Sequence, residues 1–337
     1  MKNMKKSISS VIAAAAIALS LGGQAFSQQS RTGQIKDVQD AIRQKGARWV
    51  AGETSVSNLS EDDWRYKVGL NFTELTGATI EGLEDRGLPQ AVDWRSNGGN
   101  YVTPVRDQKR CGSCWAFSMA GGLESYTLRA TNQPGRDLNL SEQVMISCSG
   151  VGSCNGGTIN PDYLTTTGLP EESAYPYTAT DGTCSAAAPG WQSNAYTIGS
   201  WGSVPHTVAG MKAALVKYGP LPTAFMVYED LMHYKSGVYS YTTGKKLGGH
   251  AVLLVGYDDV NQCFIVKNSW NTGWGETGFF RIAYSELTSP VNFGISTVAY
   301  KALNKGEQDL KRQASLDGRA AAWARVETMF GPALNWN

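Results

Sequence analysis

The stretch from Gln108 to Ser118 constrains the fold of this chain more than any other. It reads Q-K-R-C-G-S-C-W-A-F-S, and its second cysteine, Cys114, opens an apolar run that is typical of a buried helix. A thiol at a helix N-terminus lies against unpaired backbone N–H groups and the positive end of the helix dipole, which favours the thiolate. The stretch therefore predicts a nucleophilic cysteine at the start of a helix.

Three further motifs match this cysteine. Gln108 lies six positions before it, His250 stands in G-G-H-A-V-L-L-V-G-Y, and Asn268 stands in K-N-S-W-N-T-G-W-G-E. The separations from Cys114 are 250 − 114 = 136 and 268 − 114 = 154 residues. Together with C-G-S-C-W, these strings resemble the papain/cathepsin family of cysteine proteases, over about residues 88–300.

The resemblance implies a role for each of these groups. Cys114 would be the nucleophile, and His250 would form an ion pair with it and protonate the leaving amine. Asn268 would orient the imidazole, Trp270 would shield that hydrogen bond, and Gln108 with the Cys114 N–H would form the oxyanion hole. No cofactor is expected.

The resemblance also implies a substrate cleft and two disulfides. The disulfides would be Cys111–Cys154 and Cys148–Cys184, which leaves Cys114 free, with Cys263 as a buried inert thiol. The glycines of C-N-G-G (154–157) would let backbone approach a bound peptide, and the pocket for the P2 side chain carries no charge, which favours a bulky apolar residue. The expected substrate-binding residues are Gly156, Gly157, Gly249 and Trp270 together with those expected by alignment to line the P2 pocket, namely Thr158, Ile159, Ala224, Gly248, Ala251 and Val298.

Other functions remain open from the residues alone. Cys111-x-x-Cys114 could be a thioredoxin-type redox pair, but the matched downstream motifs argue against this. A papain-fold binding protein without catalysis is disfavoured because all four chemical groups are present. A thiol acyltransferase with the same residues would be distinguished by product analysis with added amines.

Composition excludes some partner classes. The formal net charge is +1, so nothing indicates nucleic acid or an anionic membrane as a partner. The chain has three histidines, none near Cys111 and Cys114 in sequence, so a metal site is not expected. The expected partners are polypeptide substrates and the chain's own propeptide, with the enzyme as a monomer.

Two regions precede the expected catalytic domain. Residues 1–27 have the charged start, apolar middle and small-residue end of a signal peptide, which predicts a secreted or periplasmic protein. Residues 28–87 would form an inhibitory propeptide, because R-W-V-A-G (48–52) is similar to cathepsin B-type propeptides and L-P-Q-A-V-D-W-R (88–95) looks like the family's mature start. An attached lid or linker is the alternative. Cleavage is expected in the Arg86–Leu88 neighbourhood.

The remaining pattern predicts an α+β fold with two subdomains, helical first and an antiparallel, barrel-like sheet second, with the cleft between them. Helices are expected at 114–131, from the Ser141 cap and at 207–218, and strands at 221–227, 251–257, 262–267 and 278–283. Residues 301–337 have the spacing of an amphipathic helix.

Four positions depart from the family pattern. Lys109 and Arg110 stand where small or amide residues are usual and add positive charge near the thiolate. Gly249 stands where Asn or Asp is frequent, and Asn271 replaces a glycine. None of these changes removes a catalytic group. No insertion with paired histidines follows Cys154, so the cleft is expected to be open at its primed end, which favours endopeptidase action.

Overall fold

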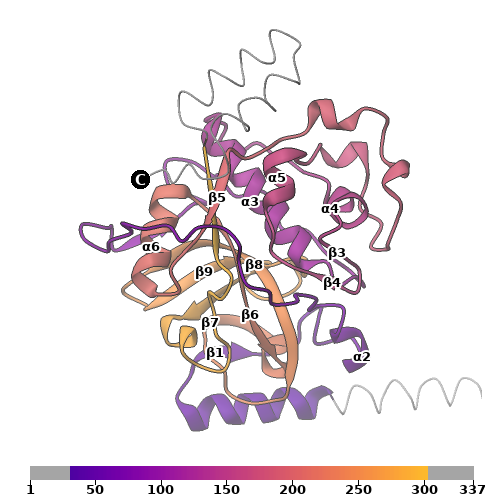
Figure 1. The fold of residues 1–337 in the computed structure, drawn as a ribbon. Helices are drawn as coiled ribbons and strands as arrows, with labels where there is room; N and C mark the ends of the chain where they lie inside the picture. The colour runs from indigo at the N-terminus through magenta and orange to yellow at the C-terminus, as the bar shows by residue number, and fades with distance from the viewer. Residues whose placement is uncertain (1–30, 303–337) are drawn as a thin grey trace, which may run out of the picture.

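The computed structural model describes residues 31–302, which form a helical half and a sheet half with an N-terminal segment lying against both (Figure 1). The expected signal peptide and C-terminal helix lie outside the described residues. Among residues 31–302, no helix combines the length and apolar character that crossing a membrane requires.

The helical half is built around the helix that begins at Cys114. This helix, α3 (Cys114–Ala130), is followed by α4 (Glu142–Cys148), and Ser141 caps α4 by accepting from the Val144 N–H at 3.1 Å, as the sequence predicts. Shorter elements complete this half: β3 (Gly152–Ser153), β4 (Gly156–Gly157), α5 (Asp162–Thr166) and the 3-10 turns η1 (Glu172–Ala174), η2 (Cys184–Ala186) and η3 (Trp191–Asn194).

Close packing explains the two glycines inside α3. A Cβ at Gly122 would lie 2.7 Å from the Pro222 side chain on β6 (Leu221–Tyr228), and a Cβ at Gly121 would touch Leu253 on β8 (Lys246–Asp258). The helix therefore lies directly on the sheet half. Its first residue is held against β8, where His250 lies.

The sheet half contains a seven-stranded sheet in the order β1-β7-β10-β9-β8-β2, with β6 pairing with β8. A separate pair, β11-β5, and the helix α6 accompany it. The remaining bounds are β1 (Arg48–Ala51), β2 (Ala91–Asp93), β5 (Ser200–Ser203), α6 (Val208–Tyr218), η4 (Glu229–His233), β7 (Tyr234–Tyr239), β9 (Cys263–Lys267), β10 (Phe279–Ala283), η5 (Tyr284–Leu287) and β11 (Val298–Lys301). Most strand pairs are antiparallel as expected, but β7 and β10 are parallel.

The N-terminal segment, defined here as residues 31–87, adds a strand to this sheet. After a helical stretch at 31–45, β1 pairs with β7, with Trp49 opposite Gly237. Trp49 is 3% exposed and packs on Tyr234 and Tyr239, and its indole N–H donates to the Ser240 carbonyl at 2.9 Å. Ile35, Val38 and Ile42 recur at i, i+3 and i+7, the spacing of one helix face, so the sequence predicts a short helix here. It does not predict this strand.

A second tryptophan fixes the next part of the segment. Trp64 ends α2 (Glu61–Trp64), is 2% exposed, and lies edge-on to His233 with ring centroids 5.8 Å apart. The buried core forms two large clusters, one in each half, and residues of the N-terminal segment belong to both: Trp49 and Trp64 to the sheet cluster and Leu70 to the helical one. The segment is therefore part of the folded core.

Candidate active site

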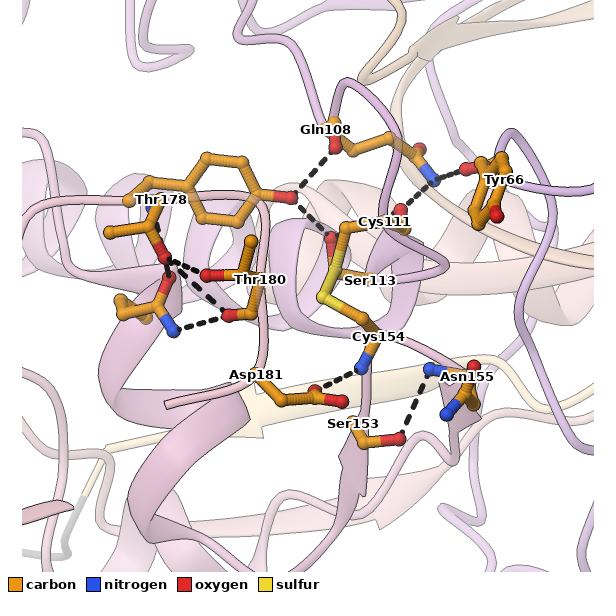
Figure 2. The surroundings of a disulfide bond; sticks show 12 residues. Tyr66, Gln108, Cys111, Ser113, Ser153, Cys154, Asn155, Thr178, Thr180 and Asp181 are labelled. Carbon is orange, nitrogen blue, oxygen red and sulfur yellow. Dashed lines mark hydrogen bonds between the residues drawn. A yellow bond between two sulfur atoms is a disulfide. The ribbon is translucent and has the colours of Figure 1, made fainter. Parts of the chain in front are cut away.

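Cys114 is the first residue of α3 and is fully buried. Cys111, three residues earlier, is bonded to Cys154, so the two cysteines of the C-x-x-C pair are not bonded to each other (Figure 2). Cys148–Cys184 is the second disulfide, and Cys114 and Cys263 are both unpaired and buried, as the resemblance implies. The thioredoxin-type alternative is thereby excluded, because its redox pair would need Cys111 and Cys114 to bond.

His250 lies on β8 and is held in one orientation from two sides. Its Nε2 donates to Oδ1 of Asn268 at 2.8 Å, and the Trp270 ring stacks on the imidazole at 4.8 Å and 29°. All three side chains are buried. Within the described residues, His250 Nδ1 has no hydrogen-bond partner. The bond to Asn268 thus leaves Nδ1 as the nitrogen available for proton exchange with a substrate or thiol.

Gln108 is completely buried beside the disulfide. Its Oε1 accepts from the Ser269 hydroxyl at 2.8 Å, and its backbone carbonyl accepts from the Tyr177 hydroxyl at 2.7 Å. These bonds fix the side-chain amide, whose Nε2 donates to the carbonyls of Cys111 (3.1 Å) and Tyr66 (2.9 Å). A fixed amide donor that binds a peptide carbonyl beside a cysteine is the arrangement an oxyanion hole requires.

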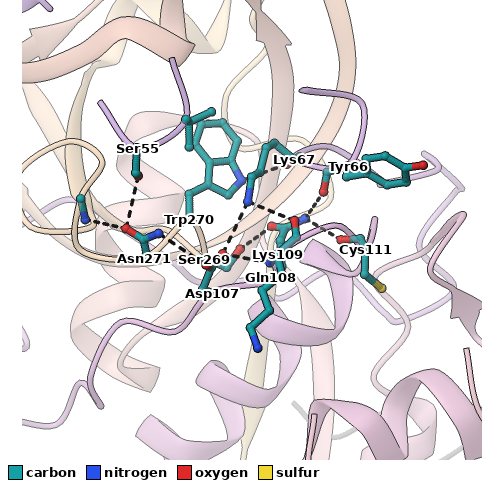
Figure 3. A network of polar contacts seen from close by, with 12 residues as sticks. Ser55, Tyr66, Lys67, Asp107, Gln108, Lys109, Cys111, Ser269, Trp270 and Asn271 are labelled. Carbon is teal, nitrogen blue, oxygen red and sulfur yellow. Dashed lines mark hydrogen bonds and ion pairs between the residues drawn. The ribbon is translucent and has the colours of Figure 1, made fainter. Parts of the chain in front are cut away.

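Tyr66 belongs to the N-terminal segment, which crosses the site from there to residue 71. Lys67 provides three contacts. Its carbonyl accepts from the Trp270 indole at 3.0 Å, and its buried Nζ donates to the Lys109 carbonyl at 3.0 Å and lies 3.5 Å from Asp107 Oδ1 (Figure 3). The backbone N–H of Leu70 donates to Gly249, and that of Asn71 donates to Gly157. The segment therefore bonds to both walls at once.

The expected substrate-binding residues line this crossing. A Cβ at Gly156 would lie 2.9 Å from the Gly69 carbonyl, and one at Gly249 would lie 2.4 Å from the Leu70 carbonyl. Glycine at these positions allows the backbone approach seen here. Leu70 is buried in the same hydrophobic cluster as four of the residues expected to line the P2 pocket, namely Ile159, Ala224, Ala251 and Val298. Thr158 and Gly248 are half-buried beside them, and Val68 approaches Gly248.

Burial disfavours the charged forms of Cys114 and His250. Desolvation raises the pKa of the Cys114 thiol to about 12, although backbone N–H groups, chiefly that of Ala251, act in the opposite direction. Desolvation also lowers the pKa of His250 to about 4, the bond to Asn268 opposes this, and the charge of Lys67 adds to the lowering. Both shifts favour the neutral thiol and the neutral imidazole over the ion pair.

The sequence reasoning missed the groups that cover the site. Tyr66, Lys67 and Gly69 carry no recognisable pattern, because their significance depends on residues far along the chain. A Cβ at Gly69 would lie 2.2 Å from the Gly112 carbonyl, so the glycine is required by contact with the active-site loop. Asn271 has a positive φ of 56°, a conformation that asparagine adopts more readily than most residues, which explains how it replaces a glycine.

Comparison with known proteins identifies a family with these features. A family model described as "Papain family cysteine protease" matches residues 88–302. The chain is 38% identical over 275 residues to "Cathepsin L-like proteinase" of Fasciola hepatica, covering 68% of this chain and 80% of that protein. It is 35% identical over 272 residues to "Thiol protease aleurain" of Arabidopsis thaliana, covering 74% and 72%.

A solved structure is similar over a larger share of the chain. Digestive procathepsin L 3 from the larval midgut of Tenebrio molitor matches with a TM-score of 0.67 and 26% identity, over 81% of this chain and 89% of that one. Residues 88–302 are less than two thirds of the 337-residue chain, so this likeness extends over more of the chain than the family model matches.

Proposed function

Because this chain belongs to the papain family of cysteine proteases, which hydrolyse peptide bonds, we propose that it is an exported endopeptidase with Cys114 as its nucleophile. The likeness to a procathepsin indicates a protease made as a proenzyme. In this proposal residues 28–87 are the propeptide, cleaved in the Arg86–Leu88 neighbourhood, and residues 88–300 are the catalytic domain. The processed enzyme acts as a monomer outside the cytoplasm, secreted or periplasmic.

The proposed mechanism begins when removal of the propeptide admits water to the site. With the desolvation relieved, the Cys114 proton moves to His250 Nδ1 and leaves a thiolate–imidazolium pair. The thiolate attacks the scissile carbonyl carbon, and the resulting oxyanion accepts hydrogen bonds from the Gln108 amide and the Cys114 N–H. The imidazolium gives its proton to the departing amine, and a thioester remains on Cys114.

Water then completes the cycle. His250, now neutral, takes a proton from a water molecule that attacks the thioester carbonyl, and the carboxylic acid leaves as the thiolate is restored. Asn268 contributes throughout by holding Nε2, so that Nδ1 stays directed at the reacting atoms. Trp270 covers this hydrogen bond and excludes water from it, which strengthens it in the low local dielectric.

One observation carries this proposal: the Tyr66 carbonyl occupies the Gln108 amide as a scissile carbonyl would. A backbone carbonyl at that donor, with the neighbouring backbone bonded to Gly157 and Gly249, is the contact set a peptide substrate needs. Leu70, buried among apolar residues, supports the expectation of a bulky apolar P2 side chain. A P2 profile that favours arginine would contradict this expectation.

The test is hydrolysis of a fluorogenic peptide with Leu or Phe at P2, under mildly reducing and slightly acidic conditions. The processed protein is run beside its Cys114→Ser variant, and mass spectrometry confirms that residues 28–87 are absent. Turnover by the first protein alone supports the proposal. Equal turnover by both would remove Cys114 as the nucleophile, and silence in both would remove the protease assignment from this site. Added amines would reveal acyl transfer.

A further inference from the structure

Two consecutive basic side chains, Lys109 and Arg110, stand exposed between Gln108 and Cys111. They depart from the family pattern, and the catalytic steps above do not use them. The Lys109 backbone has a positive φ of 52°, and it is held by Asp107 Oδ1, which accepts its N–H at 2.9 Å, and by Lys67, which binds its carbonyl. In the covered enzyme both backbone polar groups of Lys109 are therefore held, and the bond to Asp107 does not depend on the N-terminal segment.

Arg110 already binds a carboxylate in the covered enzyme. Its guanidinium lies 3.0 Å from Asp63 Oδ1 of the N-terminal segment, and it lies over the Tyr66 ring at 5.2 Å from the centroid. Tyr66 is the residue whose carbonyl occupies the Gln108 amide. The Asp63 carboxylate thus lies within three residues of the carbonyl that stands at the reacting position.

The contacts of the N-terminal segment indicate which half of the cleft Arg110 borders. Residues 69–71 bond to Gly157 and Gly249, the half that holds the P2 residue. Tyr66 marks the reacting position, and Asp63 lies beyond it on the other side. In substrate terms, Arg110 therefore borders the half that receives residues after the scissile bond.

We propose that Arg110, with Lys109 beside it, selects substrates with Asp or Glu at the second or third position after the scissile bond. This inference rests on the proposed function and specifies its substrate class. Removal of Asp63 with the propeptide leaves the guanidinium without that carboxylate, and an acidic substrate side chain replaces it. Because the Arg110 side chain is 69% exposed, the gain is modest, about two- to fivefold in kcat/KM, and salt screens it.

The test uses two pairs of internally quenched peptides, all with Leu at P2. The first pair differs only in Glu or Gln at P2′, the second position after the scissile bond. The second pair differs in the same way at P3′, the third position. For the processed enzyme we expect a Glu-to-Gln ratio of kcat/KM of about two to five at low salt in one pair, falling toward 1 in about 1 M NaCl. The Arg110→Gln variant should bring the low-salt ratio close to 1. Arg110→Glu should make a Lys-containing peptide the better substrate.

Lys245→Gln is the matched control, because it removes one positive charge from an exposed site on the connection before β8. Its Glu-to-Gln ratio should equal that of the unaltered enzyme. Efficient cleavage with a ratio of 1 at both positions overturns the inference and leaves the proposed function intact. A preference that survives Arg110→Gln overturns the assignment to Arg110. Failure to cleave any peptide overturns both the inference and the proposed function.

Discussion

Two of the regions in which the N-terminal segment contacts the rest of the chain use different chemistry. Between residues 48 and 64 it buries large side chains, Trp49 and Trp64, against the sheet half. Between residues 66 and 71 it works mainly through its backbone, with the carbonyls of Tyr66 and Lys67 and the N–H groups of Leu70 and Asn71 in hydrogen bonds.

Because of this difference, the first region provides most of the affinity of the segment, and the second provides the inhibition. Burial of a tryptophan contributes several kcal/mol, whereas a backbone hydrogen bond that replaces one to water contributes about 1 kcal/mol net. The first contact, called here the anchor (residues 48–64), therefore holds the segment in place. The second, called here the crossing (residues 66–71), blocks the reactive groups with little energy of its own, so it should fail when the anchor fails.

The largest expected effect follows from removing an anchor side chain. Trp49→Ala should weaken the bound segment by about 3–5 kcal/mol, because it empties a buried site on β7 and removes the bond to the Ser240 carbonyl. The full-length variant should then hydrolyse peptide before any processing. Val50→Ala is the control, since Val50 lies on the same strand and is 55% exposed. Retained latency in Trp49→Ala would contradict the division of roles.

An intermediate effect is expected from acid, through His233 beneath Trp64. Burial lowers the pKa of His233 to about 4 from its ordinary value of 6.5. The covered state therefore takes up this proton less readily than a state in which the side chain is hydrated. The free energy that favours the covered state is therefore unchanged above about pH 6.5. It decreases as the pH falls below that value, and the decrease is complete near pH 4. The decrease is on the order of 3 kcal/mol if release hydrates the ring fully.

The His233→Phe variant should retain the edge contact with Trp64 and lose this acid response. The measurement is hydrogen exchange of residues 48–64 between pH 7 and 4, in a Cys114→Ser background that cannot process itself. Release in His233→Phe should require a lower pH than in its parent. Desolvation is the cause that lowers the pKa of His233, and the charged residues on the elements packed around it are the same in both proteins. Identical pH profiles would assign the acid response elsewhere, for which His250 is the next group to test.

The smallest expected effect concerns the crossing. Gly249→Ala places a Cβ 2.4 Å from the Leu70 carbonyl, so the segment must shift, at a cost of about 1–3 kcal/mol. The quantity to measure is the hydrolysis rate of the unprocessed variant divided by the rate of the same variant after processing. This ratio should rise in Gly249→Ala, but by less than in Trp49→Ala. Gly33→Ala, where a Cβ meets nothing within 4 Å, is the control. A larger rise than in Trp49→Ala would reverse the ranking of the two contacts.

Local patterns predicted the elements of the catalytic domain well. Helix α3, the Ser141 cap of α4, helix α6 and strands β6, β9 and β10 begin and end within one or two residues of the sequence expectations, because periodicity and capping act over a few neighbouring residues. The two disulfides also agree. The catalytic role of Cys114 stays a prediction that the hydrolysis assay tests, and the role of His250 also stays a prediction.

Contacts between distant parts of the chain could not be predicted in this way. Strand β1 has four residues, and its pairing depends on β7, where Trp49 faces Gly237. Gly69 is needed only because Gly112 approaches it, and the Gln108 amide finds a partner in Tyr66 that no spacing rule indicates. These features depend on tertiary contact, so sequence periodicity holds no trace of them.

The pairing of β1 with β7 has a consequence for the processed enzyme. Loss of the segment turns β7 (Tyr234–Tyr239) into the outer strand of the sheet, with backbone N–H and C=O groups open to any other extended chain. Two residues protect this new edge against aggregation: Lys235 places a charge on it, and Gly237, with φ at 97°, bends it away from flat strand geometry. Removal of the segment would thus relieve inhibition and at the same time expose a sheet edge that these two residues protect.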